Sequence, residues 1–567
     1  MLTKLLLVVY VLLHVVWHWL GRIVRRVLML SHGDFLVSNS RRVAVIGGGI
    51  AGVSAAWSLS QSGKCEVTLF ESEAELGGNA KTHNWSVDPK AAPGSNNGFV
   101  RTGLSVLAWP SAYFNHYELL LRRIGVPTTV VTPRFLISSD GGRSPSFAHG
   151  ETGSDQKWVT DQERWDRAVE AARRVTAFCF WLEQMPRKLL SFIPCLGRRF
   201  VNQREQAGDS PRSIYEATWW NPLNVLPARF FVTRIWRVSD AFWDLVVVPV
   251  YSSSFLTAEL DGLPTVILPT LDEIISVGST NPLRPLATWG SGFSSKDVFD
   301  RMAADILRPG RNRITTKADL RAVEYNAARD EWVVSFGLGF EHTFDAVIFA
   351  CPARAVDKLT NTFVNRKSFR TTLYDLIIPN ILYENERDDN FTTGTIHSDV
   401  SVLPSPLQSR LLGGRFSNYI SVSPAAPTAI ENTFILGTWV PSAVKAASDG
   451  SSGSGFLPLD MYVTYRGGSN PKSLPNSTKT FGTVNNTWGH PQFTRQSLMY
   501  ALLLRLLQGR CRAYYCASYT TPGNGHDLSM LSGVICAHAV TGYYPFPEAT
   551  RLPRRDFEHL RAFMMGA

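Results

Sequence analysis

The sequence is poor in charged residues, has few cysteines and contains no internal repeat. Asp, Glu, Lys and Arg together make up 18% of the 567 residues, whereas apolar residues make up 44%. Disordered chains have the opposite balance, so the composition predicts a folded, globular protein. A chain of this length is too long for one simple core, and we expect two interleaved domains with additional segments.

The cysteines argue against two kinds of site. The sequence has seven, an odd number, without a C-x-x-C pair and without histidines at the spacing of a zinc site. Several lie in apolar stretches, where a cysteine acts as a small hydrophobic residue. The sequence therefore predicts no metal site and no disulfide framework, as is typical of a reducing compartment.

The chain also lacks a nucleic-acid-binding signature. Its net charge is +10, but the basic residues are mostly scattered arginine pairs, and neither a recognition helix nor an RNA-binding motif is present. We therefore expect no nucleic acid partner. An anionic membrane surface explains the positive charge better.

A membrane segment is predicted at the N-terminus. Residues 5–21 are uncharged and would span about 25 Å as a helix, slightly less than a hydrocarbon core of about 30 Å. One lysine precedes this stretch, and Arg22, Arg25 and Arg26 follow it. This asymmetry predicts a single-pass anchor, residues 1–30, with the body in the cytosol. A cleaved signal peptide is the alternative, although the small residues of a cleavage site are missing.

The most informative stretch, residues 43–78, has the pattern of a dinucleotide-binding βαβ unit. Residues 43–46 predict a buried strand, 53–61 a helix and 66–70 a second strand. The first turn carries a G-x-G-x-x-G motif, whose glycines permit the tight turn, admit a pyrophosphate and let the helix approach the sheet: Gly47, Gly49 and Gly52.

The end of the second strand supports the same interpretation. Glu71 lies 19 residues beyond Gly52, where such sites place an acid that accepts hydrogen bonds from ribose hydroxyls. A nucleotide-free α/β turn is the alternative. The agreement of strand, turn, helix, strand and acid favours a nucleotide cofactor.

The next residues narrow the choice of cofactor. Leu76-Gly77-Gly78 resembles the second glycine pair of the flavoprotein family that includes amine oxidases, phytoene desaturases and protoporphyrinogen oxidase. The chain departs from that family at Glu75, where an arginine or lysine is common. The resemblance implies FAD, and it implies contacts between the cofactor and Gly47, Gly49, Ile50, Ala51, Gly52, Glu71, Ser72, Gly77, Gly78 and Asn79.

The C-terminal residues 513–533 resemble the closing motif of the same FAD domain. The resemblance implies an apolar strand, a polar loop and a helix that begins near Leu531, with its dipole facing the flavin. Ala517-Ser518 stands where the family has Ala-Gly followed by Asp or Glu. The Ser518 hydroxyl would then replace a carboxylate that bonds the ribityl chain.

A third segment resembles the middle piece of that domain. Residues 318–325, 331–335 and 344–352 read as strands separated by turn signals. In the family, the backbone near Leu320 would meet the adenine. An ordinary meander is the alternative for this segment.

Together these resemblances imply an α/β fold with two interleaved domains. A Rossmann-like FAD-binding domain of the glutathione reductase type would take residues 41–105, 311–365 and 506–567. An α+β substrate domain would take residues 106–310 and 366–505.

Two segments of the substrate domain have unusual composition. Residues 446–478 are rich in serine and glycine and predict a flexible insertion. Residues 160–200 predict a helix rich in arginine and aromatic residues. Such a helix suits a membrane surface, and a core helix with a solvated basic face is the equal alternative.

Shorter motifs suggest a class of substrate. Residues 395–404, 488–493 and 525–527 resemble a subgroup of predicted NAD/FAD-binding proteins encoded beside, or fused to, cyclopropane fatty acid synthases. This implies a hydrophobic small molecule, such as a lipid acyl chain, that exchanges a hydride with the flavin. An amine or polyamine oxidase that releases peroxide is the enzyme alternative, and a membrane scaffold without chemistry is the alternative of another class. The electron acceptor is not predicted.

The sequence offers few catalytic candidates, because flavin chemistry is carried by the cofactor. His526 lies in a loop expected beside the flavin and is the candidate for proton handling or flavin polarisation. Asp527 reads as the N-cap of the following helix, and loop capping is the alternative for His526 as well. His397 and His490 are further candidates on the resemblance alone.

Overall fold

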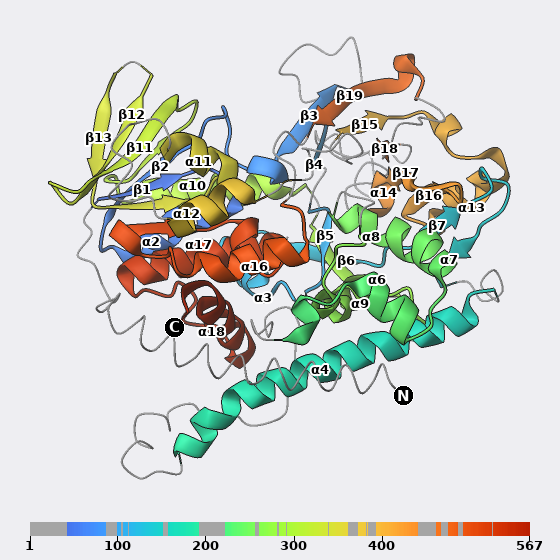
Figure 1. Cartoon of the computed structure of the whole chain (residues 1–567). Helices are drawn as coiled ribbons and strands as arrows, with labels where there is room; N and C mark the ends of the chain where they lie inside the picture. Colours follow the sequence, from blue (N-terminus) through green and yellow to red (C-terminus); the bar gives the residue numbers. More distant parts are fainter. Residues whose placement is uncertain are drawn as a thin grey trace.

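The computed structural model describes most of the chain (Figure 1). The described residues are 42–86, 99–103, 106–111, 113–150, 157–191, 221–255, 260–279, 283–290, 292–337, 339–360, 372–381, 383, 393–439, 461–466, 475–485, 491–523 and 525–566. The predicted anchor, residues 1–30, lies outside them. Within the described part of the chain, no helix combines the length and hydropathy that a membrane crossing needs.

One half of the folded molecule, called the first half below, is built on a five-stranded parallel sheet in the order β10-β2-β1-β14-β20. Its strands come from three separated parts of the chain: β1 (Arg42–Ile46), β2 (Glu66–Phe70), β10 (Arg313–Thr315), β14 (Ala346–Phe349) and β20 (Ala513–Tyr515). All side chains of β14 and β20 are buried, as expected when both faces of a parallel sheet are covered. The predicted α/β class is confirmed.

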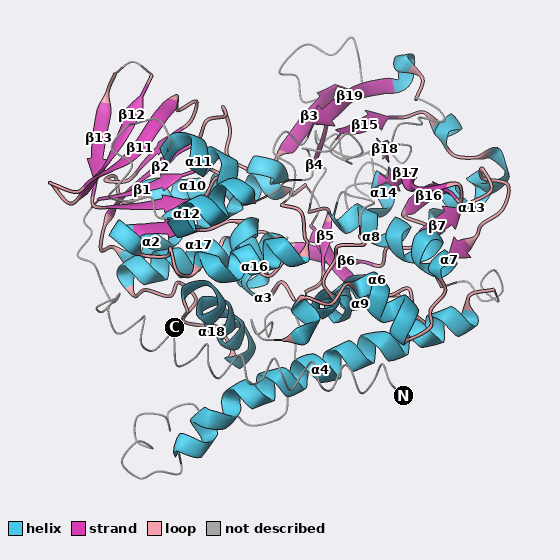
Figure 2. Ribbon diagram, in the orientation of Figure 1, coloured by secondary structure: helices cyan, strands magenta, loops and turns pink. Residues whose placement is uncertain are grey.

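Helices cover one face of this sheet, and a small antiparallel sheet covers the other (Figure 2). Val43, Val45 and Ile348 pack in one core with α2 (Ile50–Ser62), α10 (Ser295–Leu307) and α17 (His526–Thr541). Ala44, Ile46 and Phe349 point the other way, toward β11 (Leu320–Asn326), β12 (Glu331–Phe336) and β13 (Glu341–Phe344). Because side chains alternate along each strand, the strands contribute residues to two separate hydrophobic cores.

Helices α2 and α17 touch backbone to backbone at Gly533. A Cβ atom at this position would lie 2.0 Å from the Ala51 carbonyl oxygen and 2.6 Å from Ser54 Oγ. The Ser54 hydroxyl also donates a hydrogen bond to the Met530 carbonyl oxygen, at 2.8 Å. Glycine is therefore required at position 533 for the two helices to pack at this distance.

We expect Gly533→Ala to destabilise the protein by about 3 kcal/mol, because the overpacked Cβ outweighs the helix propensity that alanine gains. Chemical denaturation at a fixed cofactor content measures the difference. Gly413→Ala is the matched control, since a Cβ there meets no atom within 4 Å, and it should change stability by less than about 0.5 kcal/mol. Equal stability of the two variants would contradict the packing argument.

The second half of the molecule contains a seven-stranded mixed sheet in the order β19-β15-β18-β17-β16-β7-β8. Its strands are β7 (Phe135–Ser138), β8 (Phe147–Ala148), β15 (Thr393–His397), β16 (Asn418–Ser423), β17 (Ala426–Ile435), β18 (Tyr462–Arg466) and β19 (Thr480–Asn485). A three-stranded sheet, β5-β9-β6, lies between the halves, and β3 pairs with β4. These strands are β3 (Thr82–Ser86), β4 (Phe99–Gly103), β5 (Ala108–Trp109), β6 (Thr128–Val131) and β9 (Leu286–Trp289).

Helices surround both halves, and the longest of them, α4, runs along the outside of the molecule (Figure 1). The remaining helices are α3 (Asn115–Arg123), α4 (Val159–Ser191), α6 (Ala228–Phe230), α7 (Asp240–Phe242), α8 (Val248–Phe255), α9 (Leu268–Ile274), α11 (Ala353–Thr360), α12 (Thr372–Ile377), α13 (Gln408–Arg410), α14 (Leu436–Trp439), α16 (Arg495–Leu504) and α18 (Arg551–Met565).

Two sequence predictions differ from the structure. The stretch 446–478, predicted as a flexible insertion, contains β18, which is hydrogen-bonded between β15 and β17 and has buried side chains at Tyr462 and Val463. The segment 344–352, read as a single strand, is divided between the end of β13 and β14. In both cases long-range strand pairing decided the structure, and local composition does not report such pairing.

Candidate functional site

The G-x-G-x-x-G turn after β1 and the Gly77-Gly78 pair after β2 lie next to each other at the carboxyl ends of these strands. Gly47 has φ +111°, and a Cβ there would lie 2.7 Å from the Ala350 carbonyl oxygen. At Gly52 a Cβ would lie 1.8 Å from the Gly47 carbonyl oxygen. The Gly77 amide donates to the Gly48 carbonyl oxygen at 2.9 Å. These contacts hold the first and second glycine segments side by side.

Gly49 differs from its neighbours, because the protein itself does not require a glycine there. Its backbone is extended, with φ −72°, and a Cβ would meet only the Gly78 Cα, at 4.0 Å. Gly78 faces it from the second segment, where a Cβ would lie 3.2 Å from the Gly49 Cα. The two glycine backbones therefore touch, and the space into which a Gly49 Cβ would point is open among the described residues. We call this open space the gap, and it suits the close approach of a pyrophosphate.

The first turn of α2 opens on the same gap. Gly49 is the N-cap, and it supplies no side-chain acceptor; the first turn also contains no acidic residue. The amides of Ile50 and Ala51 have no partner within the helix, as at any helix N-terminus. Free amides and the positive end of the helix dipole together favour an anion at this position.

Glu71 is a buried carboxylate that joins the two loops. Its Oε2 accepts a hydrogen bond from the Gly48 amide at 2.6 Å, and its Oε1 accepts one from the Glu73 amide at 2.8 Å and one from the Ser72 hydroxyl at 3.1 Å. Each carboxylate oxygen has two acceptor positions, so Oε2 keeps one for an outside donor. The ribose contact stays a prediction, and the structure adds a second role in fixing the glycine loop.

The middle segment lies next to the end of β2. The Ala318 amide donates to the Glu71 carbonyl oxygen and the Lys317 amide to the Glu73 carbonyl oxygen, both at 2.8 Å. Leu320 then begins β11, two residues later. The structure therefore brings Leu320 to the Glu71 side of the gap, where the predicted adenine contact would have to lie.

The C-terminal segment reaches the sheet edge in a strained conformation. Ala517, directly after β20 and Cys516, has φ +144° and ψ −178°, a region in which residues other than glycine are rare. Its amide donates to the Ser532 hydroxyl oxygen at 3.1 Å, and its carbonyl oxygen accepts from the Thr520 hydroxyl at 2.8 Å. Glycine adopts this conformation readily, and the residue that follows Ala517, Ser518, is half-buried.

The helix that follows begins earlier than predicted. It starts at His526, with Gly525 as its N-cap, and not near Leu531, which lies fully buried inside the helix. Asp527 is not the N-cap. Its Oδ1 instead accepts a hydrogen bond from the Tyr117 amide at 2.6 Å, so the carboxylate caps the first turn of α3. Asp527 is therefore a helix-capping residue, as its residue type predicts, but it caps α3 and not α17.

His526 lies against the aromatic ring of Tyr117. The centroids of the His526 and Tyr117 rings lie 4.7 Å apart in an edge-to-face arrangement. Burial lowers the pKa of His526 to about 3, so the ring is neutral at physiological pH. Its Nε2 has no hydrogen-bond partner among the described residues. A neutral imidazole with one free nitrogen can donate or accept a single hydrogen bond, but it carries no charge.

The other predicted residues take varied positions. Asn79 and Ser72 are exposed beside the second glycine pair. His397 is fully buried in the second half of the molecule, where Nδ1 accepts from the Asp399 amide at 3.2 Å and Nε2 lies 2.8 Å from Thr464 Oγ1. Those contacts make His397 a satisfied core residue. His490 lies outside the described residues.

Sequence reasoning missed three residues that shape this site. Ser532 holds the strained Ala517, Gly533 lets α17 approach α2, and Tyr117 contacts both His526 and Asp527. A glycine inside a helical pattern was a usable signal for Gly533. Tyr117 lies 410 residues before Asp527 in the sequence. No local sequence pattern identifies it as a residue of this site.

Burial of His526 predicts a pH dependence of stability. The unfolded chain protonates this residue near its ordinary pKa of 6.5, whereas the folded protein does so only near pH 3. Stability is therefore fully present above pH 6.5 and falls as the pH drops toward 3, at up to about 1 kcal/mol per pH unit for this residue. In His526→Gln the plot of unfolding free energy against pH should be flatter below pH 6.5 by that amount.

Denaturation of both proteins across this pH range measures the slopes. His342→Gln is the control, because His342 is exposed on β13. A slope that does not change in His526→Gln would mean that the folded protein protonates the ring freely.

Comparison with known proteins agrees with this architecture. The family model of an NAD(P)-binding Rossmann-like domain matches residues 45–123. A CLA-producing fatty acid isomerase from P. acnes is similar over 88% of this chain and 98% of its own, with 11% identity and a TM-score of 0.53. A triple mutant of putrescine oxidase is similar over 88% and 98%, with 12% identity and a TM-score of 0.52.

A third solved structure, reduced UDP-galactopyranose mutase, is similar over 92% of this chain and 99% of its own, with 11% identity and a TM-score of 0.51. At these identities the similarity concerns the fold. The similarity of fold extends over 88% to 92% of this chain.

Proposed function

We propose that this protein is a FAD-dependent oxidoreductase. The observation that carries the proposal is the gap beside Gly49, where a Cβ would meet no atom of the described residues closer than the Gly78 Cα at 4.0 Å. The free amides of the α2 first turn and the buried carboxylate of Glu71 flank the same gap.

The residues present fit the cofactor at both ends. The glycine backbones and the α2 amides would hold the pyrophosphate, Glu71 the adenosine ribose, and the start of β11 the adenine. The α17 N-terminus, with His526, would lie toward the flavin end. When bound, FAD supplies the hydride acceptor or donor, and the protein contributes orientation, exclusion of water and the neutral imidazole of His526.

For the substrate we propose a hydrophobic molecule, such as a lipid acyl chain. The apolar N-terminal stretch supports this choice, because a membrane anchor would place the body beside its substrate. The fold shared with a fatty acid isomerase is consistent with it. The resemblance to proteins associated with cyclopropane fatty acid synthases points the same way. A flavin amine oxidase is the second candidate, since putrescine oxidase shares the fold as well.

The variant Gly49→Ala tests the cofactor proposal without disturbing the fold. Because the new Cβ meets only the Gly78 Cα, at 4.0 Å, the apoprotein should lose no more than about 1 kcal/mol of stability, the cost of replacing an N-cap glycine by alanine. The affinity for FAD should fall about tenfold or more, equivalent to about 1.4 kcal/mol, because the Cβ enters the gap. Fluorescence titration with FAD measures the affinity, and Gly413→Ala is the control.

Wild-type protein that shows no flavin absorbance and binds no added FAD would refute the proposal and leave the non-catalytic scaffold as the better description. Equal FAD affinity in the wild type and Gly49→Ala would show that the nucleotide does not pass through this gap.

The substrate class can be tested with the flavin as the indicator. We expect anaerobic addition of an unsaturated fatty acid or a phospholipid to bleach the flavin absorbance or to yield a modified acyl chain, measured by spectroscopy and mass spectrometry. Putrescine should have no effect. Bleaching by putrescine, with peroxide released in air, would instead establish the amine oxidase alternative, while the proposed cofactor would stand.

A further inference from the structure

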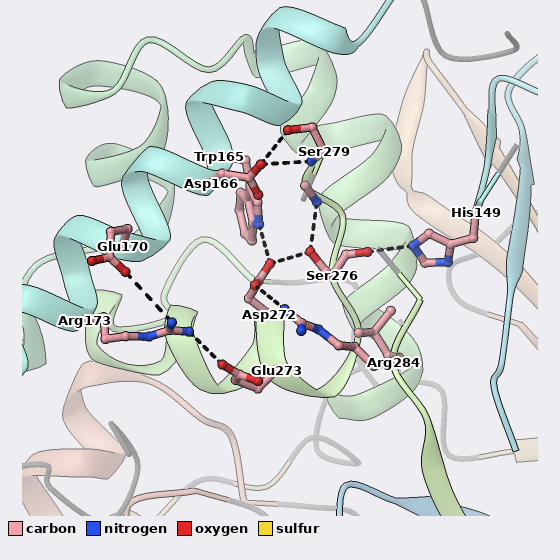
Figure 3. Close-up of polar contacts among 12 residues, drawn as sticks. His149, Trp165, Asp166, Glu170, Arg173, Asp272, Glu273, Ser276, Ser279 and Arg284 are labelled. Carbon is pink, nitrogen blue, oxygen red and sulfur yellow. Dashed lines mark hydrogen bonds and ion pairs between the residues drawn. The ribbon is translucent and has the colours of Figure 1, made fainter. Parts of the chain in front are cut away.

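The helix α4 is fixed to the body of the molecule along its inner side. The Trp165 indole N–H donates to Asp272 Oδ1 at 3.0 Å, and Arg173 Nη2 donates to Glu273 Oε1 at 2.8 Å, so both contacts tie α4 to α9. Asp166 Oδ2 accepts from the Ser279 hydroxyl at 2.6 Å. Figure 3 shows these three side chains of α4 pointing together toward α9 and the loop that follows it.

The same network continues deeper into the protein. The Ser276 hydroxyl donates to Asp272 Oδ1 at 2.8 Å, and the Ser276 carbonyl oxygen lies 2.8 Å from His149 Nε2 (Figure 3). Arg284 Nη2 lies 3.5 Å from Asp272 Oδ2. A buried, branched network of this kind leaves α4 one orientation about its axis, which determines the residues that face outward.

The outward side of α4 changes character along its length. Arg167, Glu170, Arg174, Phe178 and Trp181 follow one another at spacings of three or four residues and so share one side of the helix. The arginines form ion pairs with acids one turn earlier on the same helix. Beyond Arg174, the next two outward residues are aromatic. A charged stripe thus gives way to an apolar one.

The two aromatic side chains are unusually exposed for their size. Phe178 is 49% exposed and Trp181 is 47% exposed, and their rings stack with centroids 6.0 Å apart and an interplanar angle of 24°. The stacked pair shields its inner ring faces and presents the rest of its surface outward. Exposed aromatic side chains are typical of proteins at a membrane interface, where the ring lies between the hydrocarbon region and water.

The charge beside this pair is positive at its outer edge. The side chain of Arg174 is 79% exposed, against 46% for its partner Glu170. An exposed arginine beside exposed aromatic rings complements an anionic lipid surface better than a neutral one, because the guanidinium can bind a lipid phosphate.

We propose that the face of α4 formed by Arg174, Phe178 and Trp181 lies in the headgroup region of an anionic lipid bilayer. The aromatic pair enters the boundary between headgroups and acyl chains, and the arginine contacts lipid phosphates. This contact is separate from the predicted anchor at residues 1–30, and it does not depend on the proposed flavin chemistry. It would fix the orientation of the body on the membrane, which a single tether does not do.

Photo-crosslinking of the full chain in lipid nanodiscs tests this contact locally, whether or not the N-terminal segment spans the bilayer. Trp181 is replaced by the photoreactive amino acid p-benzoylphenylalanine, and the nanodiscs contain alkynyl lipids with or without phosphatidylglycerol. Phe340 receives the same replacement as a control, because it is 65% exposed just before β13 in the other half of the molecule. The flavin absorbance of each sample reports separately on the cofactor.

We expect about ten times more lipid adduct at position 181 than at position 340, and less when phosphatidylglycerol is omitted. Adding Arg174→Glu to the chain with the probe at position 181 should lower the lipid adduct several-fold while circular dichroism stays unchanged. Crosslinks from position 181 to a second copy of the chain would overturn the proposal in favour of a protein interface. The proposal would also be overturned by equal labelling at positions 181 and 340, or by labelling that does not depend on phosphatidylglycerol. Failure of the protein to bind the nanodiscs would overturn it as well.

Discussion

The rest of the structure depends on the close contact between the backbone of α2 and its two neighbours. Gly52 lets the helix begin against the end of β1, since any Cβ there would overlap the Gly47 carbonyl oxygen. At a second contact of the helix, Gly533 lets α17 lie directly against Ala51. Two glycines thus let the helix pack closely against the sheet and against α17. Its free N-terminal amides are thereby placed where three separate chain segments meet.

The sequence predicts this region well because the elements involved are consecutive. The strand, glycine turn, helix and second strand between Val43 and Phe70 are continuous in sequence, and local hydrophobic pattern and turn chemistry are enough to identify them. The end of α2 at Gly63 follows the same logic, because Gly63 has the left-handed conformation of a helix C-cap, with φ +67°.

The errors have a common physical origin in long-range contacts. Asp527 carries the composition of an N-cap and does cap a helix, but the helix is α3, brought to it by tertiary packing. β18 follows a serine-rich and glycine-rich stretch, and it becomes a strand because β15 and β17 leave a place between them. The exposure of Phe178 and Trp181 follows from the orientation of α4, which the network around Asp272 fixes from other segments. Periodicity alone could not separate a core face from an outer one.

The strained backbone of Ala517 affects how the C-terminal loop could contact a cofactor. A conformation of this kind costs about 1–3 kcal/mol and persists only where the surroundings enforce it. Here Ser532 and Thr520 hold both the amide and the carbonyl of the residue, so the loop presents backbone to the crevice despite the alanine side chain. Ser518 contributes a hydroxyl to this end of the site and no negative charge. Glu71, at the other end, remains a buried carboxylate bound to the glycine loop. Recognition of the nucleotide would then rest mainly on Glu71 and the α2 amides, which act on the adenosine and the pyrophosphate. The flavin end would be held by backbone and by packing.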